Sequence, residues 1–321
     1  MRLIFLYLGV CVSVTVAQVC NGYAELCGRK WSNISEIGTH DSAFVGELPT
    51  ENQDIDVTAQ LNAGIRFLQA QTHYFFGVLT LCHTSCFELD AGPAVNYLSD
   101  IKTWLDSNPN DVVTLLLTNG DYVPVGNFSA VMEASGLARY AYTPPHQLAI
   151  DEWPTLQEMI TAGDRLVMFL DYDANTNVAP YILPEFSYFF ETAYDVTTPT
   201  FPTCTLDRPP GSDGAGLLPL INHYLDLDIF GILIPDRLAA PTTNAATGVG
   251  SIGAQADLCT AAWGRKPRVM LLDYFNTGNA LAAQNTLNGL PVKNSAGSNS
   301  IVPPQWLSFC LIVFATLRVL S

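Results

Sequence analysis

Short apolar runs recur along the chain, and several of them end in a polar or acidic residue. The runs are SNISEIGTHD, IRFLQAQTH, LTLCHTS, DVVTLLLTNGD, DRLVMFLDYD, SYFFETAYD, DIFGILIPD and RVMLLDYF. Stretches such as VVTLLL and RLVMFL are apolar on both faces, which is typical of parallel strands that are covered on both sides. Helix-like stretches lie between many of the runs. In AGPAVNYLSDIKTWLDSNP, apolar residues recur at helical spacing at Ala94, Leu98, Ile101 and Leu105.

This alternation predicts a single α/β domain. About eight strands that alternate with helices over ~270 residues favour a (β/α)8 barrel over an open, doubly wound sheet. No glycine-rich phosphate loop follows the first strand, so a nucleotide-binding fold is not supported. In a barrel, the polar residues that end the strands meet at one face, where catalytic groups lie. They are His40, Asp41, His83, Asn119, Asp121, Asp171, Asp173, Asp236 and Asp273.

The first residues have the features of a secretory signal peptide. Met1–Ala17 contains Arg2, the apolar run LIFLYLGVCV and small residues before a cleavage point. The apolar part is too short for a membrane span, which needs about 20 residues. We therefore expect residues 1–17 to be removed and the mature chain to begin at Gln18.

The last residues resemble a glycosylphosphatidylinositol attachment signal. Small residues at 294–296 precede a polar spacer and the apolar tail Trp306–Leu320. Asn294 is the preferred anchor site, which leaves 18–294 as the mature domain and 295–321 as the part removed. A membrane helix is the alternative, but the tail is short and no basic cluster follows it. We expect the protein at the outer face of the plasma membrane or in the cell wall.

Cysteine usage agrees with export. The mature chain keeps an even number of cysteines, which suggests three disulfides: Cys20, Cys27, Cys82, Cys86, Cys204 and Cys259. Nearness in sequence favours Cys20–Cys27 and Cys82–Cys86, with Cys204–Cys259 remaining. Six cysteines allow 15 connectivities, and a zinc site is the competing interpretation. Asn33 and Asn127 lie in glycosylation sequences.

The charge balance limits the partners. The chain carries a formal net charge of −16. A strongly acidic protein is repelled by nucleic acid and gains nothing electrostatically from an anionic lipid surface. We therefore expect no nucleic-acid partner, and we expect a monomer.

Three motifs resemble a known family. IGTHDSA, AGIRFLQAQTH and LCHTSC are similar to the X domain of phosphatidylinositol-specific phospholipases C, above all to secreted fungal PLC-like phosphodiesterases. The similarity runs from Ile34 to Asp121 and continues weakly through PTLQEMI, LVMFLDYD and VMLLDYF. It implies a distorted TIM barrel that cleaves an inositol phosphodiester, anchored to a membrane that holds the substrate.

The resemblance also implies roles for individual residues. The inositol 2-hydroxyl would attack the phosphorus, with His40 as general base and His83 as general acid. Histidine suits both tasks because its ordinary pKa is about 6.5. Asp273 is the best candidate for the carboxylate that orients the base, Asp41 is expected to line the site, and Asp171 is a weaker candidate.

One departure from the family concerns the phosphate. Where bacterial relatives have a D-x-R pair, this chain has Gln69-Ala70-Gln71, and calcium-binding acids are missing as well. Gln69, Gln71 and His73 alternate at period two and so share one face of a strand. We expect these three side chains to bind the phosphate. The alternative is a barrel without activity that binds an inositol lipid or a surface glycan.

The headgroup and the metal are left open by the motifs. A related barrel hydrolase could act on a sphingolipid or a glycerophosphodiester, but such enzymes recruit metals through acids on the early strands. No cofactor is expected, although Asp41, Asp121 and Asp171 offer oxygen ligands for calcium. The aromatic residues of EFSYFFETAY could insert into a membrane or pack in the core.

Overall fold

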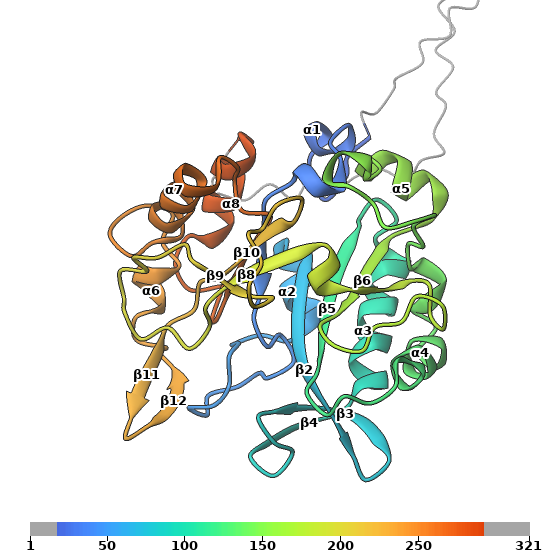
Figure 1. Ribbon diagram of the computed structural model, residues 1–321, viewed down its shortest axis with the longest axis horizontal. Coiled ribbons are helices and arrows are strands. Elements are labelled where there is room, and N and C mark those ends of the chain that lie inside the picture. The colour runs from blue at the N-terminus through green and yellow to red at the C-terminus, as the bar shows by residue number, and fades with distance from the viewer. Residues whose placement is uncertain (1–17, 292–321) are drawn as a thin grey trace, which may run out of the picture. The chain divides into compact units, whose positions relative to one another are not determined.

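The computed structural model describes residues 18–291. The predicted signal peptide and the predicted anchor site Asn294, with residues 295–321, lie outside this part of the chain. Within it, eight strands pair in parallel in the order β7-β6-β5-β2-β1-β13-β10-β8 (Figure 1). Their bounds are β1 Glu36–Thr39, β2 Phe67–Phe75, β5 Val113–Asn119, β6 Leu166–Leu170, β7 Ile182–Pro184, β8 Phe189–Thr192, β10 Leu218–Asn222 and β13 Val269–Leu272.

The sheet curls but does not close in the part of the chain that is described. Its edge strands are β7 and the antiparallel β9 (Leu206–Arg208), which pairs with β8. A second antiparallel arm, β3 (Val78–His83) and β4 (Leu89–Pro93), extends from β2. The predicted α/β architecture is confirmed, but the predicted closed barrel is replaced by a curled, open sheet.

Helices cover the outside of the sheet. They are α1 Ala24–Cys27, α2 Val57–Ala63, α3 Ala94–Ser107, α4 Val125–Ala134, α5 Leu156–Ala162, α6 Ala240–Thr243, α7 Ile252–Trp263 and α8 Ala280–Asn288. Four short 3-10 turns are also present among residues 18–291: η1 Trp31–Asn33, η2 Ala138–Tyr140, η3 Ile150–Glu152 and η4 Glu185–Ser187.

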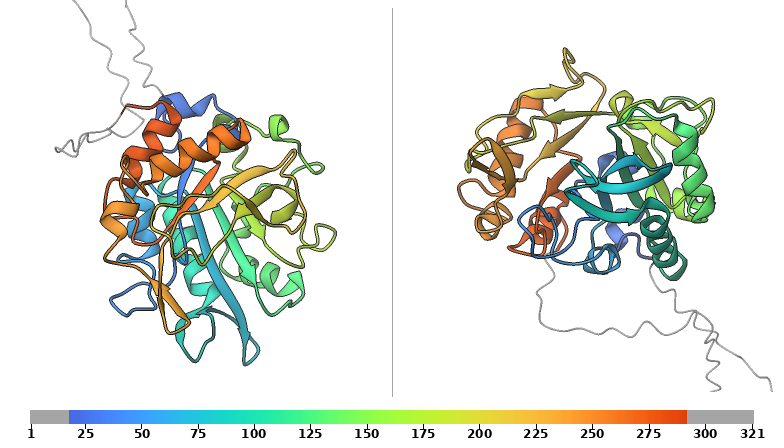
Figure 2. Two further views of the ribbon diagram at one scale, coloured as in Figure 1. Left: turned by 60° about the vertical axis from the view of Figure 1, so that its left-hand side comes forward. Right: turned by 90° about the horizontal axis from the view of Figure 1, so that it is seen from below.

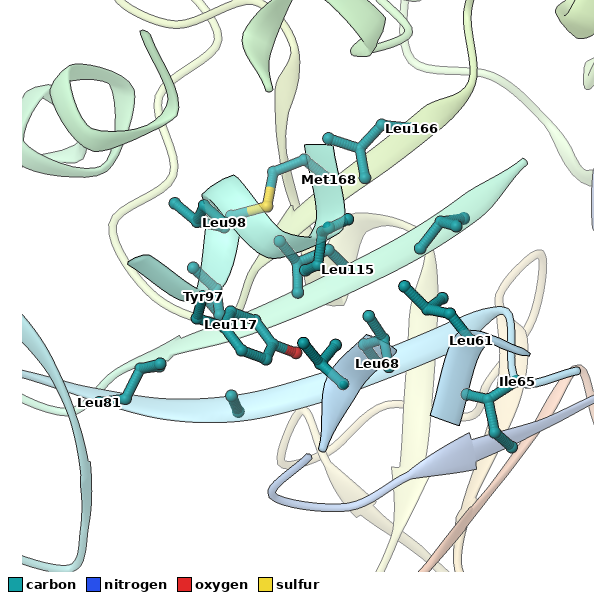
Figure 3. Close-up of a cluster of buried hydrophobic side chains, with 14 of the residues drawn as sticks. Leu61, Ile65, Leu68, Leu81, Tyr97, Leu98, Leu115, Leu117, Leu166 and Met168 are labelled. Carbon is teal, nitrogen blue, oxygen red and sulfur yellow. The ribbon is translucent and has the colours of Figure 1, made fainter. Parts of the chain in front are cut away.

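Both faces of the strands are buried, which explains their uniformly apolar sequences. In β5, Leu115 and Leu117 belong to the cluster under the helices, whereas Leu116 belongs to the cluster inside the curl. Figure 3 shows Leu115 and Leu117 beside Tyr97 and Leu98 of α3. Because side chains alternate along a strand, a strand between two apolar layers needs apolar residues at successive positions.

Two strand predictions were wrong. DIFGILIPD was expected to be a strand of the barrel, but it belongs to a separate hairpin, β11 (Asp226–Ile229) and β12 (Ile232–Pro235). Its place in the sheet is taken by β10, which contains Pro219. A central strand with a proline lacks one ladder donor, so the apolar pattern gave no reason to expect it there.

The aromatic residues of EFSYFFETAY pack in the core. Tyr188, Phe189 and Phe190 are buried, and Tyr188 and Phe189 both contact the ring of Phe169. The alternative that these side chains insert into a membrane is therefore wrong. Within the described residues, no helix is long and apolar enough to span a membrane.

Three disulfides form with the predicted pairing: Cys20–Cys27, Cys82–Cys86 and Cys204–Cys259. The third bond joins the segment before β9 to α7, across 55 positions of sequence. The zinc alternative for these cysteines is thereby excluded. Asn33 is exposed and Asn127 is half-buried on α4, and their glycosylation stays a prediction.

The two ends of the curled sheet differ in what they carry. Asn288, at the end of α8, accepts a hydrogen bond from the backbone N–H of Ser35, just before β1. The hairpins β3–β4 and β11–β12 project at the other end, as two views show (Figures 1 and 2). His40 follows β1 and therefore lies toward the hairpin end.

Candidate active site

The site begins at the carboxyl ends of strands. His40 follows β1, His83 ends β3 and Asp273 follows β13. At each of these points the chain turns through a non-glycine residue in the left-handed region: Asp41 (φ 45°), Thr84 (φ 59°) and Tyr274 (φ 46°). Such a conformation costs about 1–2 kcal/mol for an L-residue and gathers at functional sites. Three of them at three strand ends therefore mark this edge as a candidate active site.

Asp41 lies between the two histidines. It is fully buried, and its Oδ2 lies 3.5 Å from Nε2 of His40 and 3.4 Å from Nε2 of His83. Gln71 donates a hydrogen bond from Nε2 to the same oxygen at 2.9 Å. The structure thus brings together the two histidines that the motifs placed at one mouth, with a shared carboxylate oxygen between their Nε2 atoms.

His40 is held from three sides. Its Nδ1 lies 2.9 Å from Oδ1 of Asp273, and its ring stacks on Tyr224 with centroids 3.7 Å apart and planes within 6°. Asn52 donates to the same Asp273 oxygen at 3.1 Å. Burial alone would lower the pKa of His40, but Asp41 and Asp273 outweigh it and raise that pKa to about 9. At neutral pH His40 is therefore an imidazolium.

His83 is held less tightly. Its ring meets Phe44 edge to face, with centroids 5.3 Å apart. The next residue, Thr84, donates its backbone N–H to Oε1 of Gln71 at 3.1 Å. Gln71 therefore links Asp41 to the turn that follows His83, and it positions one histidine relative to the carboxylate between both.

The three residues expected to bind phosphate have different partners. Oε1 of Gln69 accepts the backbone N–H of Asp41 at 2.7 Å, so both glutamines orient Asp41. His73 lies farther along β2, with Nδ1 3.0 Å from Oδ1 of Asp121. Gln69 and Gln71 line the pocket described next, whereas His73 is not among its lining residues. The structure therefore does not join all three in one phosphate-binding group.

A pocket of about 230 Å³ opens beside His40. It is lined by His40, Gln69, Gln71, Leu116, Thr118, Gly120, Asp171, Glu185, Glu191, Tyr194, Arg208, Asn222, Tyr224 and Leu271. This volume is below the ~300–1,000 Å³ of sites that enclose a drug-sized ligand. The pocket therefore suits a small polar headgroup and leaves no room for acyl chains.

Arg208 is the functional residue that the sequence motifs missed. It comes from the edge strand β9 and pairs with Glu191 on β8. Its guanidinium lies 4.8 Å from the ring centroid of Tyr194. Burial lowers the pKa of Arg208, but Glu191 and Glu185 raise it further, so the cation is permanent. Among the described residues that line the pocket, Arg208 is the one arginine or lysine.

Acidic groups surround this arginine. Burial, followed by the nearby Glu191, raises the pKa of Glu185 well above its ordinary value. Burial also raises the pKa of Asp171 to about 6, against the backbone N–H groups of Asn119 and Tyr172 that it accepts. This wall of the pocket therefore holds protonated and ionised carboxyl groups side by side, which can accept and donate hydrogen bonds to a hydroxylated ligand.

The carboxylates considered for calcium do not meet. Asp41 accepts from Gln71, Asp121 from the backbone of Tyr74, and Asp171 from the backbone of Asn119. Across residues 18–291, no group of three or more histidine, cysteine, aspartate or glutamate side chains has a metal-binding arrangement.

Fold and site together define the class: a curled α/β sheet with histidines and a carboxylate at its mouth, built like barrel-type phosphodiesterases. The match to a family model is more specific. Residues 26–288 match the model of the PI-PLC X family, and the chain belongs to this family.

Relatives and solved structures agree with this assignment. PI-PLC X domain-containing protein 1 of Arthroderma benhamiae is 50% identical over 297 residues, covering 89% of this chain and 97% of that protein. An uncharacterized secreted protein of the same organism is 46% identical, covering 83% of this chain and 62% of the other. The phosphatidylinositol-specific phospholipase C of Listeria monocytogenes has a similar fold, with a TM-score of 0.55 at 15% identity over 87% of this chain and 100% of that one.

Proposed function

We propose that this protein is a phosphodiesterase that cleaves an inositol phospholipid or a related phosphodiester through a cyclic phosphate. The observation that carries the proposal is the arrangement of His40 and His83 about Oδ2 of Asp41, with Asp273 behind His40. Two imidazoles on one side of a small polar pocket can serve one phosphate as base and acid.

The proposed reaction balances its protons between the two histidines. The 2-hydroxyl oxygen of the inositol attacks phosphorus while Nε2 of His40 takes its proton. The bond from phosphorus to the diacylglycerol oxygen breaks, and His83 protonates that oxygen. Asp273 holds the Nδ1–H of His40 and stabilises the imidazolium that forms. Because the resting His40 is already protonated near pH 7, it must lose a proton before each turnover.

Arg208 supports activity despite the missing D-x-R pair. Charge that develops on the phosphate oxygens needs a cation or strong donors, and this electrostatic contribution is usually the largest one. Gln71 directs its amide to Asp41, so it is not free for that role. Arg208 lines the same pocket as His40 and reaches it from another strand, so it is the cation that we assign to the phosphate.

The test uses the full chain secreted from a eukaryotic host, phosphatidylinositol as substrate, and added calcium or chelator. We expect cyclic inositol phosphate from the wild type in both conditions. His40→Ala and His83→Ala should each lower the rate by roughly 100-fold or more. His146→Ala is the matched control, because His146 is exposed and pairs with Glu152 away from the pocket. Equal rates for all three variants would refute the assignment.

The second candidate is a protein that binds an inositol lipid or a surface glycan without cleaving it. The two glutamines favour it, because they replace catalytic residues and serve to hold Asp41. Arg208→Gln separates the candidates. A loss of turnover with little change in substrate binding supports the enzyme. A wild type that binds phosphatidylinositol and gives no cyclic product supports the binding protein.

We also propose that the protein is secreted and carries a lipid anchor at Asn294. The predicted signal peptide supports secretion, as does the relative that is itself called a secreted protein. Mass spectrometry of the secreted chain tests this: a first residue of Gln18, a modified Asn294 and glycans on Asn33 and Asn127 are expected. An unmodified chain that still contains residues 295–321 would refute the anchor.

A further inference from the structure

Two hairpins end in the same unusual turn. The pair β2–β3 turns through Phe76-Gly77, and β11–β12 turns through Phe230-Gly231. All four residues have positive φ angles: 47° and 84° in the first turn, 56° and 85° in the second. A two-residue turn of this type favours asparagine or aspartate at its first position. Phenylalanine is poorly suited to it, because the left-handed region strains a bulky L-residue.

Neither phenylalanine gains from packing what it loses in conformation. Phe76 meets the ring of Phe75 but is 87% exposed, and Phe230 is fully exposed. Further apolar side chains are exposed beside the two turns; together they form what we call the apolar rim, namely Phe76, Val78 and Phe87 at the first turn and Leu227, Ile229, Phe230 and Ile232 at the second. A strained aromatic residue at two turn tips, with its ring in water, indicates a role outside the folded chain.

The apolar rim flanks the candidate active site. β3 begins at the first turn and ends at His83, and Phe87 lies in the loop that follows. Arg237, just after β12, pairs with Asp54 and donates to the carbonyl of Gly46, in the loop that follows Asp41. Both hairpins project at the same end of the molecule in two views (Figures 1 and 2).

We propose that the apolar rim is a lipid-docking surface that inserts both hairpin tips into a membrane whose surface is zwitterionic. The proposal extends the proposed function, since it places the lipid phase at the mouth that would cleave a lipid. Within each hairpin, the backbone groups next to the turn pair across the strands, so a tip can enter an apolar phase without leaving many of them unpaired.

Shape and charge favour lipid over a protein partner. The tips are convex and belong to separate hairpins, so a rigid protein would need two matching pockets, whereas a fluid bilayer adapts to both. The net charge of −16 gives no attraction to anionic lipid. Docking must therefore rest on apolar burial, as expected for exposed phenylalanine and isoleucine side chains.

The test measures binding of the full chain to phosphatidylcholine vesicles. The double variant Phe76→Asn/Phe230→Asn should keep or raise stability, because asparagine tolerates this turn. Its partition coefficient should fall by about tenfold or more, since each phenyl ring buried in oil contributes more than the ~1.4 kcal/mol that equals a factor of ten. Binding should persist at high salt. The matched control is Leu258→Asn on α7, where Leu258 is 45% exposed at the other end of the molecule.

A second readout reports the tip itself. Tryptophan in Phe230→Trp should show a blue-shifted emission and quenching by lipids with brominated acyl chains, relative to the wild type, and tryptophan in Leu258→Trp should show neither. A tryptophan at position 230 that stays in water on the bound protein, or unchanged partition of the double variant, would overturn the proposal. Lipid-independent dimers that the double variant loses would assign the apolar rim to a second copy instead.

Failure of this proposal can be separated from failure of the proposed function. A monomeric, water-soluble inositol phosphodiester needs no membrane, so the double variant should turn it over at the wild-type rate. Vesicle binding without any turnover would keep the lipid-docking surface and refute the enzyme. Turnover with no effect of the tips on binding would do the reverse.

Discussion

His40 carries most of the electrostatic tension in the site. It is largely buried between two carboxylates, one at each ring nitrogen, and Tyr224 covers one face of its ring. Desolvation disfavours the imidazolium, and the two acids more than compensate for this effect. A histidine in this environment is a poor base at neutral pH and a good one only when the proton has left.

The pH dependence of activity should reveal this pKa. Because the pKa of His40 is raised to about 9, its neutral form grows as the pH rises toward that value. If His40 is the base, kcat/KM should rise from pH 7 to about 9. Asp273→Asn removes one raising charge, so the rising limb should move to lower pH. A wild-type profile that falls over the same range would exchange the roles of His40 and His83.

The same proton links activity to stability. The folded state holds the proton of His40 more tightly than the unfolded chain, whose histidines have a pKa of about 6.5. The stabilisation is therefore complete below pH 6.5 and disappears as the pH rises through about 9. Activity and unfolding should be measured on the same samples, so that a loss of fold is not mistaken for titration of the base.

At the scale of elements, strand β1 is the most tightly packed part of the mouth. A Cβ on Gly38 would lie 2.7 Å from a side-chain carbon of Leu271 and 2.9 Å from one of Phe67. Both neighbours belong to the inner apolar cluster and have little space to move. This glycine allows β13 and β2 to approach β1, and so sets the distance between Asp273 and His40.

Gly38→Ala should destabilise the protein by about 1–3 kcal/mol through overpacking, with a loss of activity from the displaced mouth. The measurement is urea unfolding with matched kinetics. Gly126→Ala on α4 is the control, because nothing lies within 4 Å of its added Cβ. That control should be neutral or stabilising by up to about 1 kcal/mol. Equal effects at both glycines would contradict the packing argument.

Sequence reasoning found elements whose periodicity is unbroken and missed those that carry an interruption. The runs of β5 and β6 are apolar throughout, so their burial on both faces could be predicted. Pro219 hid β10, although the strand lies between β13 and β8. The run DIFGILIPD looked like one buried strand because Phe230 does not signal a turn, even though Gly231 follows it.

At the scale of the molecule, the disulfide Cys204–Cys259 controls the segment that supplies Arg208. It ties the chain just before β9 to α7, while Cys20–Cys27 closes a loop near the first helix. The chain-entropy model scales with loop length. The longer bond should therefore matter more for stability, and only the longer bond lies near a pocket residue.

Replacing both cysteines of Cys204–Cys259 by serine should cost about 4 kcal/mol of unfolding free energy, against about 2.5 kcal/mol for Cys20–Cys27. The sequence separations of 55 and 7 residues set this order. Thermal or denaturant unfolding of the two double variants tests it. A larger loss for the short loop would show that strain or native contacts dominate over loop closure.

The candidate site shows the same limit on a larger scale. His40, Asp41, His83 and Asp273 lie in motifs or at apolar strand ends, so they could be predicted from local sequence. Arg208, Tyr224 and Glu191 could not, because their roles depend on where later strands join the sheet. The phosphate-binding role expected for His73 followed from its period along β2, and the partner Asp121 lay on another strand.

The end of α8 lies beside the start of β1, whereas the two phenylalanine tips project beyond the strand ends. A lipid tether a few residues after Pro291 would then hold the catalytic mouth facing outward, away from the bilayer that bears the tether. Such a molecule would work in trans, on lipids of an opposing cell, a vesicle or debris at the wall, and would spare its own leaflet unless it tipped over.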